Sequence, residues 1–262
     1  EEPSRAIFKK KDSSLLRAME AVAHQDRSAF VSAGHSGAVL VSAIMAVGKV
    51  AGVSRPALGT FLPTKTGSVL CLDLGANTDC KAEYLYQFAL MGDCYVQLTK
   101  NITHPRIALL SNGAERYKGP QMVKDAYALL EKSSLRFMGN IESKEIFNNY
   151  ADVVVCDGFA GNVLLKAIQG AVSSMKSWLQ QEYQHNLLSK IAGFLSKPVF
   201  KRVAKKIDYT QYGGALLLGV NAPVIVAHGS SDALAIENAL LNAHAIVNDS
   251  IVSRFNYNLA DM

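Results

Sequence analysis

Apolar runs alternate along the chain with short polar, glycine-rich turns and with amphipathic stretches of helical spacing. The runs at 69–74, 107–110, 153–156 and 223–227 show little polar alternation, which predicts buried strands. Amphipathic stretches follow most of these runs. The repeated order of strand, turn and helix predicts an α/β fold, in the form of a three-layer α/β/α Rossmann-like sandwich around a mostly parallel sheet.

The stretch 153–166 joins one such strand to a helix through two tight turns. Asp157-Gly158 and Gly161-Asn162 break the strand, and helical spacing begins after Asn162. A helix that starts here points free N–H groups and its positive dipole end out of the sheet edge, which suits a phosphate. Glycine at such a turn also serves close packing between helix and strand, so the turn alone leaves both interpretations open.

Polar turns of the same kind follow other predicted strands, and we expect them to meet at one edge of the sheet. A further helix is predicted after the lysine run 9–11, where Asp12 or Ser13 can cap it. That run is either solvated surface or a source of cations for the free N–H groups. The other polar turns lie at 34–37, 73–80, 111–119, 139–142 and 228–232. We expect 229–232 to open the final helix.

A long apolar pattern of helical spacing continues from Val163 to Leu195 and resumes after Pro198 among lysines. We expect the proline to interrupt the helix and to give a protruding helical hairpin at 176–207. Its apolar and cationic tip packs in a homodimer or dips into an anionic membrane surface, and the two are compatible. The residues predicted to face a membrane or partner are Leu187, Ile191, Phe194, Lys197, Phe200, Lys201 and Arg202.

With 262 residues and 49% apolar content, the chain can bury a full core, and we treat 1–262 as one domain. No apolar run approaches the roughly 18 residues of a membrane span and no secretory segment is evident, so we expect a cytoplasmic protein. The net charge of +5 is local, because the stretch between Glu182 and Asp208 carries only basic charges. This placement argues against nucleic-acid binding.

Composition and motif spacing also bear on cofactors. The four cysteines lack metal-ligand spacing, so we expect reduced thiols and no metal. Gly34 and Gly37 do not complete a G-x-G-x-x-G pattern, which disfavours a dinucleotide, and no other cofactor is expected.

Several motifs in their order and spacing resemble one known family across nearly the whole chain. They are KKDSS at 10–14, DLGANTD at 73–79, GNIE at 139–142, DGFAGN at 157–162, YGGA at 212–215 and HGSS at 228–231. Together they resemble the bacterial phosphate acyltransferase family known as PlsX. The family usually begins with a further strand and helix bearing an Asp-Ala-Met-Gly-Gly-Asp motif. The present sequence shows no such motif, so we expect either a truncated chain or an incomplete active site.

Two positions depart from the family pattern. His35-Ser36 stands where the family commonly has Asn-Thr, and Ser111 stands where it commonly has Asn. The resemblance implies acyl transfer from acyl carrier protein to inorganic phosphate, which yields an acyl phosphate for phosphatidic acid synthesis. It also implies a homodimer with a fold related to that of phosphotransacetylases and isocitrate dehydrogenases, bound peripherally to the inner face of the cell membrane.

This reaction needs a phosphate seat, alignment on the thioester and donors for the tetrahedral oxyanion, but no covalent enzyme nucleophile. The candidate catalytic residues are Asn77, Lys118, Asn140, Asn162, Lys166 and His228. The candidate phosphate-binding residues are Gly34, Ser36, Gly37, Gly158, Gly161, Gly229 and Ser230. The carboxylates Asp73, Asp79, Glu115 and Asp157 would repel phosphate, so we expect them to hold the loops.

Other functions stay open at this point. A phosphotransacetylase-like enzyme would use an acyl coenzyme A thioester, and a non-catalytic membrane scaffold would use the hairpin to recruit lipid enzymes. A nicotinamide-dependent dehydrogenase of related fold is disfavoured, because no aspartate cluster on a helix could bind the metal that such enzymes use.

Overall fold

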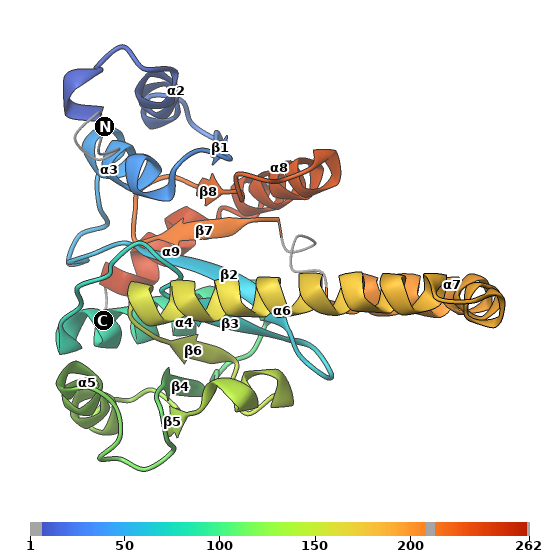
Figure 1. Cartoon of the computed structure of the whole chain (residues 1–262). Helices are drawn as coiled ribbons and strands as arrows, with labels where there is room; N and C mark the ends of the chain where they lie inside the picture. The colour runs from blue at the N-terminus through green and yellow to red at the C-terminus, as the bar shows by residue number, and fades with distance from the viewer. Residues whose placement is uncertain (1–6, 208–212, 261–262) are drawn as a thin grey trace.

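The computed structural model describes residues 7–207 and 213–260, in which eight strands form one mixed sheet with helices on both faces (Figure 1). The strand order is β1-β8-β7-β2-β3-β6-β4-β5. Tyr212 of the 212–215 motif lies outside the described residues. The strands are β1 Phe30–Ser32, β2 Ala57–Pro63, β3 Ser68–Leu72, β4 Ile107–Leu110, β5 Phe137–Ile141, β6 Val153–Val155, β7 Ala215–Leu218 and β8 Val224–Val226.

Side-chain alternation along the strands divides the core between the two faces of the sheet. Leu70 and Leu72 of β3 face one cluster, while Val69 and Cys71 face the other. The first face is covered by α4 (Ala82–Lys100), α5 (Gln121–Glu131), α8 (Ala233–Asn248) and α9 (Ile251–Ala260). The second is covered by α2 (Ser14–Ala23), α3 (Ser36–Ala46), α6 (Gly158–Gln184) and the 3₁₀ helix η1 (Ser143–Asn148). The predicted α/β/α sandwich is therefore confirmed.

Strand direction changes within the sheet. The pairs β1–β8, β3–β6, β6–β4 and β4–β5 are parallel, whereas β8–β7, β7–β2 and β2–β3 are antiparallel. Consequently β1 and β8 run opposite to β3, β4, β5 and β6, and their carboxyl ends lie at the other edge. The expectation that all polar turns meet at one edge is wrong, because three antiparallel pairings reverse the sheet between the two groups.

The predicted protruding hairpin is formed by α6 and α7 (Leu187–Ile207), which extend beyond the sheet (Figure 1). The rings of Tyr183 and Phe200 meet edge to face across the two helices, at 5.5 Å between centroids. The chain turns at 185–186, where the Asn186 side chain accepts the Ser189 N–H at 2.8 Å. The predicted break at Pro198 is wrong. Pro198 lies inside α7, which tolerates the loss of one backbone donor, whereas the asparagine cap fixes the turn.

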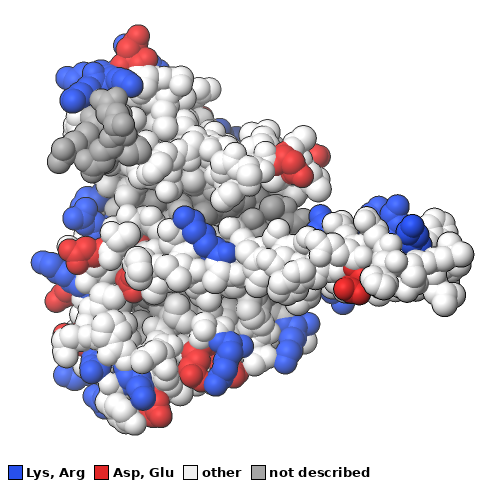
Figure 2. Space-filling view, in the orientation of Figure 1, with Lys and Arg blue, Asp and Glu red and all other residues white. Residues whose placement is uncertain are grey.

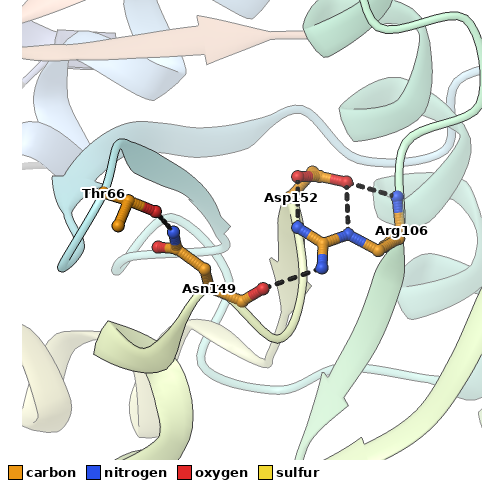
Figure 3. A network of polar contacts seen from close by, with 4 residues as sticks. All are labelled: Thr66, Arg106, Asn149 and Asp152. Atoms are coloured by element: carbon orange, nitrogen blue, oxygen red, sulfur yellow. Dashed lines mark hydrogen bonds and ion pairs between the residues drawn. The ribbon is translucent and has the colours of Figure 1, made fainter.

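The amino ends of β4 and β6 are joined by an ion pair between Arg106 and Asp152 (Figure 3). The guanidinium donates from Nη2 to Oδ1 at 2.9 Å and from Nε to Oδ2 at 3.0 Å, and the Arg106 backbone N–H also donates to Oδ2. Nη1 donates to the Asn149 carbonyl, and the Asn149 side chain donates to the Thr66 hydroxyl of the β2–β3 hairpin. The network therefore links the amino ends of β4 and β6 to the turn of the β2–β3 hairpin.

Replacing Asp152 by Asn should destabilise the fold in a pH-dependent way. Burial raises the pKa of Asp152, but the hydrogen bonds and charge of Arg106 outweigh it and leave this pKa below its usual value. A depressed folded-state pKa adds stability above the unfolded pKa of about 3.9 and loses it as the pH falls further. We expect Asp152→Asn to cost about 1–3 kcal/mol near neutral pH and progressively less below about pH 4, as measured by urea unfolding.

Asp125→Asn on the exposed side of α5 is the matched control and should change stability by less than about 0.5 kcal/mol. A destabilisation by Asp152→Asn that is independent of pH would contradict the ion-pair explanation.

Candidate functional site

The polar turns form two separate rims at opposite edges of the sheet. We call the first the carboxylate rim; it follows β3, β4, β5 and β6 and comprises 73–79, 111–119, 139–142 and 157–166. We call the second the histidine rim; it follows β1 and β8 and comprises 34–37 and 228–231. Each rim holds part of the predicted site.

Asp73 at the end of β3 is fully buried and organises the loop after it. Its Oδ1 accepts the N–H of Leu58 at 2.9 Å and those of Gly75 and Ala76. Its Oδ2 accepts the Asn77 N–H at 2.7 Å and the Asn77 side-chain amide at 2.9 Å. Burial raises the pKa of Asp73, and these donors act in the opposite direction. Asp73 thus has the surroundings of a loop-holding carboxylate.

Asn77 is a structural partner of this loop. Besides its bond to Asp73, the amide donates to the Pro56 carbonyl at 2.7 Å, and the side chain is buried. Both amide hydrogens are therefore used inside the protein. The predicted role of Asn77 as a donor to phosphate or to an oxyanion does not fit this arrangement.

The N-terminus of α6 is already capped by Asp157. The Oδ1 atom of Asp157 accepts the N–H groups of Phe159 and Ala160 at 3.0 Å. Gly158 donates its N–H to the Asn77 carbonyl at 2.7 Å, and Gly161 donates to the Asp157 carbonyl at 2.9 Å. The first turn of α6 is therefore neutralised by a carboxylate, and the two glycine N–H groups are not free for the predicted phosphate.

Packing explains why both positions are glycine. A Cβ on Gly161 would collide with the Asp73 carbonyl oxygen, and a Cβ on Gly158 would collide with the Asn77 backbone. The structure therefore favours the packing interpretation of the DGFAGN turn, in which the helix approaches the β3 loop too closely for any side chain.

Other predicted residues of the carboxylate rim retain free polar groups. Asn162 is half-buried beside Gly75, and Lys166 lies exposed one helical turn further on. Within the described part of the chain, neither side chain has a hydrogen-bonding or ionic partner. These two residues could still contact a substrate at this edge.

The loops after β4 and β5 are joined through Asn140. Its Nδ2 donates to the Glu115 carbonyl at 2.9 Å, whereas its buried Oδ1 has no partner among the described residues. Glu115 and Lys118 flank Gly113, and Lys118 forms no ion pair with a described carboxylate. Asp79 is exposed. This half of the rim therefore holds one ammonium group, on Lys118, and one buried amide oxygen, on Asn140, that has no partner among the described residues.

In the histidine rim, His35 and His228 lie in the loops that follow two neighbouring parallel strands, β1 and β8. His35 Nδ1 accepts the Gly37 N–H at 3.1 Å and so caps α3. His228 Nδ1 accepts the Ser230 N–H at 3.2 Å and lies 2.7 Å from the Ser230 hydroxyl. With Nδ1 an acceptor, each neutral ring carries its proton on Nε2. Both side chains are exposed, so both can present an N–H donor to a ligand.

Several backbone groups of this rim are used locally. Gly34 donates its N–H to the Ser32 hydroxyl at 3.1 Å, so the N–H groups of Gly34 and Gly37, predicted to bind phosphate, are occupied. Gly229 lies beside the Ala33 carbonyl, which places the two loops next to each other. The Ser36 hydroxyl has no partner among residues that the structure describes. The first turn of α3 contains no acidic residue.

The helix after β8 starts later than predicted. α8 begins at Ala233, and its cap is Asp232, which accepts the Ala235 N–H at 2.9 Å. Of the segment 229–232 that was predicted to open this helix, only Asp232 does so, because 229–231 form a turn before it. The sequence did hold the signal for both carboxylate caps: an aspartate directly before a helical pattern is a common N-cap.

The N-terminus of α2 also approaches the histidine rim. The side chain of Leu15 reaches 4.0 Å from the Cβ position of Gly34, and Ser13 caps α2 by accepting the Leu16 N–H. The lysine run 9–11 precedes Leu15, the residue that contacts this rim, by a few positions in the sequence. Among the described residues, no group of three or more His, Cys, Asp and Glu could hold a metal ion.

Two glycines of α6 offer a paired test of the packing explanation. Gly161→Ala should cost about 2–4 kcal/mol, since the added methyl must displace the β3 loop or strain α6. Gly170→Ala, in open space on the same helix, should stabilise by up to about 1 kcal/mol. Urea unfolding of both variants measures the difference. Equal stability of the two would show that the first turn of α6 has room for a side chain.

Comparison with known proteins shows to which family the chain belongs. A family model described as "Fatty acid synthesis protein" matches residues 1–254. A phosphate acyltransferase of Thermoanaerobacterium thermosaccharolyticum is 46% identical over 97% of this chain and 76% of its own length. A phosphate acyltransferase of Campylobacter jejuni is also 46% identical, over 90% of this chain and 72% of its own length.

Solved structures agree on the fold. The EutD phosphotransacetylase from Staphylococcus aureus superposes with a TM-score of 0.55 at 16% identity, covering 97% of this chain and 75% of that one. A phosphotransacetylase from Streptococcus pyogenes gives 0.52 at 21% identity, over 83% and 62%. At such identity the likeness concerns the fold alone. The family match and the 46% identity decide the relationship, and the chain belongs to the fatty acid synthesis protein family, together with the relatives named phosphate acyltransferase.

Proposed function

We propose that this protein transfers a fatty acyl group from an acyl carrier protein to inorganic phosphate, forming an acyl phosphate for phospholipid synthesis. Family membership across residues 1–254 is the observation that carries acyl transfer to phosphate. Acyl carrier protein as the donor is the finer part of the proposal. It is supported by the family resemblance and by local clusters of lysine, because a carrier protein is acidic and docks best on a basic surface.

The chemistry requires no covalent enzyme intermediate. A phosphate oxygen attacks the thioester carbonyl carbon, the C–S bond breaks, and the thiolate leaves and takes up a proton. Burial raises the pKa of Cys71 to about 12 and that of Cys80 to about 11, and it also raises the pKa of Cys156. These thiols stay protonated near neutral pH and are poor nucleophiles. Their state supports direct attack by phosphate.

The histidine rim is the better candidate for the phosphate seat. At the carboxylate rim, Asp157 already occupies the positive end of α6, and the buried Asp73 lies behind it. At the histidine rim, the first turn of α3 has no acidic residue, and His35 and His228 each offer an Nε2–H donor. A dianion is stabilised by N–H donors and by a helix N-terminus that carries no carboxylate, and it is repelled by carboxylates. Asn162, Lys166, Lys118 and Asn140 form the second candidate seat.

The α6–α7 hairpin is the proposed surface for a second copy and for the membrane. Its exposed apolar side chains include Trp178, Leu188 and Phe194, which are 66%, 80% and 76% exposed. Lys and Arg side chains gather toward its far end (Figure 2). Among the described helices, none combines the length and apolar character needed to cross a bilayer. An apolar stripe with cations around it suits peripheral binding to anionic headgroups.

Phosphate-dependent release of thiol from a long-chain acyl carrier protein, with the acyl phosphate trapped by hydroxylamine, tests the function and the choice of rim. We expect His228→Ala to lower kcat/KM by about tenfold or more, equivalent to about 1.4 kcal/mol of lost transition-state stabilisation. His244→Ala, on the exposed side of α8, is the matched control and should have less than a twofold effect, within about 0.4 kcal/mol.

Asn162→Ala separates the two rims in the same assay. A near-normal rate in Asn162→Ala with a collapse in His228→Ala would support the histidine rim, and the reverse pattern would move the phosphate seat to the carboxylate rim. Turnover of acyl coenzyme A but not of acyl carrier protein would contradict the proposed donor.

Removing apolar area from the hairpin tests membrane binding. The double variant Leu188→Ser/Phe194→Ser should bind vesicles with anionic lipid at least about tenfold more weakly, because each buried large side chain contributes about 1.5–3 kcal/mol. Vesicle sedimentation measures this, and binding should weaken as salt screens the lysines. Leu234→Ser/Leu240→Ser on α8 removes two other exposed leucine side chains, each 55% exposed, and is the control. Unchanged vesicle binding with loss of the dimer in sedimentation velocity would assign the hairpin to the subunit interface alone.

A further inference from the structure

A serine in the loop after β8 contacts a histidine of the same loop, in the part of the molecule where the phosphate seat is proposed. The Ser230 hydroxyl oxygen lies 2.7 Å from His228 Nδ1, and the Ser230 backbone N–H donates to the same nitrogen at 3.2 Å. Both residues are exposed. Two groups of one residue therefore meet one nitrogen of the imidazole ring.

The backbone contact decides which way the hydroxyl contact runs. A backbone N–H can only donate, so in the neutral ring the lone pair lies on Nδ1 and the proton lies on Nε2. A proton on Nδ1 would point at the proton of the Ser230 N–H. The hydroxyl therefore donates to Nδ1 as well, and it is the closer of the two donors. The bonds from Ser230 thus set the tautomer of His228.

The acidic residue that follows this loop does not hold the ring. Asp232 caps α8 by accepting the Ala235 N–H at 2.9 Å, and it forms no ion pair with His228 within the ranges that the structure describes. A carboxylate in contact with one ring nitrogen would favour a proton on that nitrogen. Among the described side chains, Ser230 is thus the hydrogen-bonding partner of the ring.

The neighbouring histidine lacks such a side-chain contact. His35 Nδ1 accepts the Gly37 N–H at 3.1 Å, and the Ser36 hydroxyl contacts no polar group of the described chain. Both loops therefore share a bond from the backbone two residues further on, which the turn itself provides. The hydroxyl bond in the loop after β8 is an addition that the turn does not require.

We propose that Ser230 is a positioning residue for the transfer reaction, whose hydroxyl holds His228 in the Nε2–H tautomer so that the ring presents a fixed donor to phosphate. This role differs from the predicted one, in which Ser230 binds phosphate, because the hydroxyl proton is already used at Nδ1. In this tautomer Nε2 has no lone pair in the ring plane, so His228 donates to phosphate and does not take a proton from it. The inference rests on the proposed function for the identity of the anion.

The tautomer is measured in the full chain without substrate. Long-range ¹H–¹⁵N correlation spectra of the ¹⁵N-labelled protein, at a pH at which the rings are neutral, should show the Nε2–H tautomer for His228, whose signals are identified by their loss in His228→Gln. Ser230→Ala should move the averaged Nδ1 and Nε2 shifts of His228 toward each other, because the Nδ1–H form becomes populated. Ser230→Thr keeps the hydroxyl and should restore the original shifts.

His244 on α8 is the reference within the same spectra. Its Nε2 lies 2.8 Å from the amide nitrogen of Asn248, which is a donor, so the neutral His244 ring carries its proton on Nδ1. We expect His244 to show the opposite tautomer from His228 and to be unaffected by Ser230→Ala.

Kinetics of acyl transfer separate positioning from direct binding. Ser230→Ala should raise the KM for phosphate about fivefold with kcat within about twofold, because one bond that supports uniform binding is lost. In the His228→Ala background the same change should have less than about a twofold effect, since Ser230 acts through the ring. Ser230→Thr should restore the KM. Ser253→Ala, on the exposed side of α9, is the matched control and should change neither background.

A proton on Nδ1 of His228 in the unaltered protein, or shifts of His228 that do not respond to Ser230→Ala, would overturn the proposal. An equal loss from Ser230→Ala in both backgrounds would also overturn it, because Ser230 would then contact phosphate directly. A chain without acyltransferase activity in which the tautomer of His228 still depends on Ser230 would count against the proposed function and leave the tautomer assignment standing.

Discussion

The buried carboxylate of Asp73 holds together the centre of the structure. It accepts hydrogen bonds from Leu58 on β2 and from the loop 75–77 after β3. That loop in turn accepts the first N–H of α6 through the Asn77 carbonyl. A buried carboxyl group is tolerated only when its oxygens have hydrogen-bonding partners. The bonds to Asp73 therefore fix the positions of the loop, the β2–β3 pair and the start of α6 relative to one another.

The reversal of strand direction in the middle of the sheet determines at which edge each group of polar side chains lies. Two antiparallel neighbours, β7 and β2, separate the parallel group that carries Asp73 and Asp157 from the parallel pair that carries His35 and His228. One edge therefore holds the buried Asp73 and the α6 cap Asp157, and the other holds His35, His228 and the α8 cap Asp232. The two groups of polar side chains are therefore held at opposite edges of the sheet, and no single ligand contacts both directly.

The sequence was informative about where strands and helices lie in the chain, and less informative about how they are arranged in the sheet. Apolar runs predicted the strands around Val153 and Leu70, and the spacing after Asn162 predicted the helix, because burial and periodicity are local properties. Strand direction depends on how connections cross the sheet, which hydropathy does not encode. The glycines of the DGFAGN turn were ambiguous for a related reason: close packing and ligand binding both demand a missing side chain, and only the position of the Asp73 carbonyl distinguishes them. The aspartates before α6 and α8 could have been recognised as caps.

The length of α6 has a mechanical consequence. Its 27 residues form one continuous rod of about 40 Å, at about 1.5 Å per residue. One end is bonded to the loop that Asp73 holds, and the other projects beyond the sheet (Figure 1). A rod fixed at its base moves as a lever and not as a flexible tether. Whatever the tip rests on therefore sets the orientation of the whole sheet, and with it the direction in which both rims face.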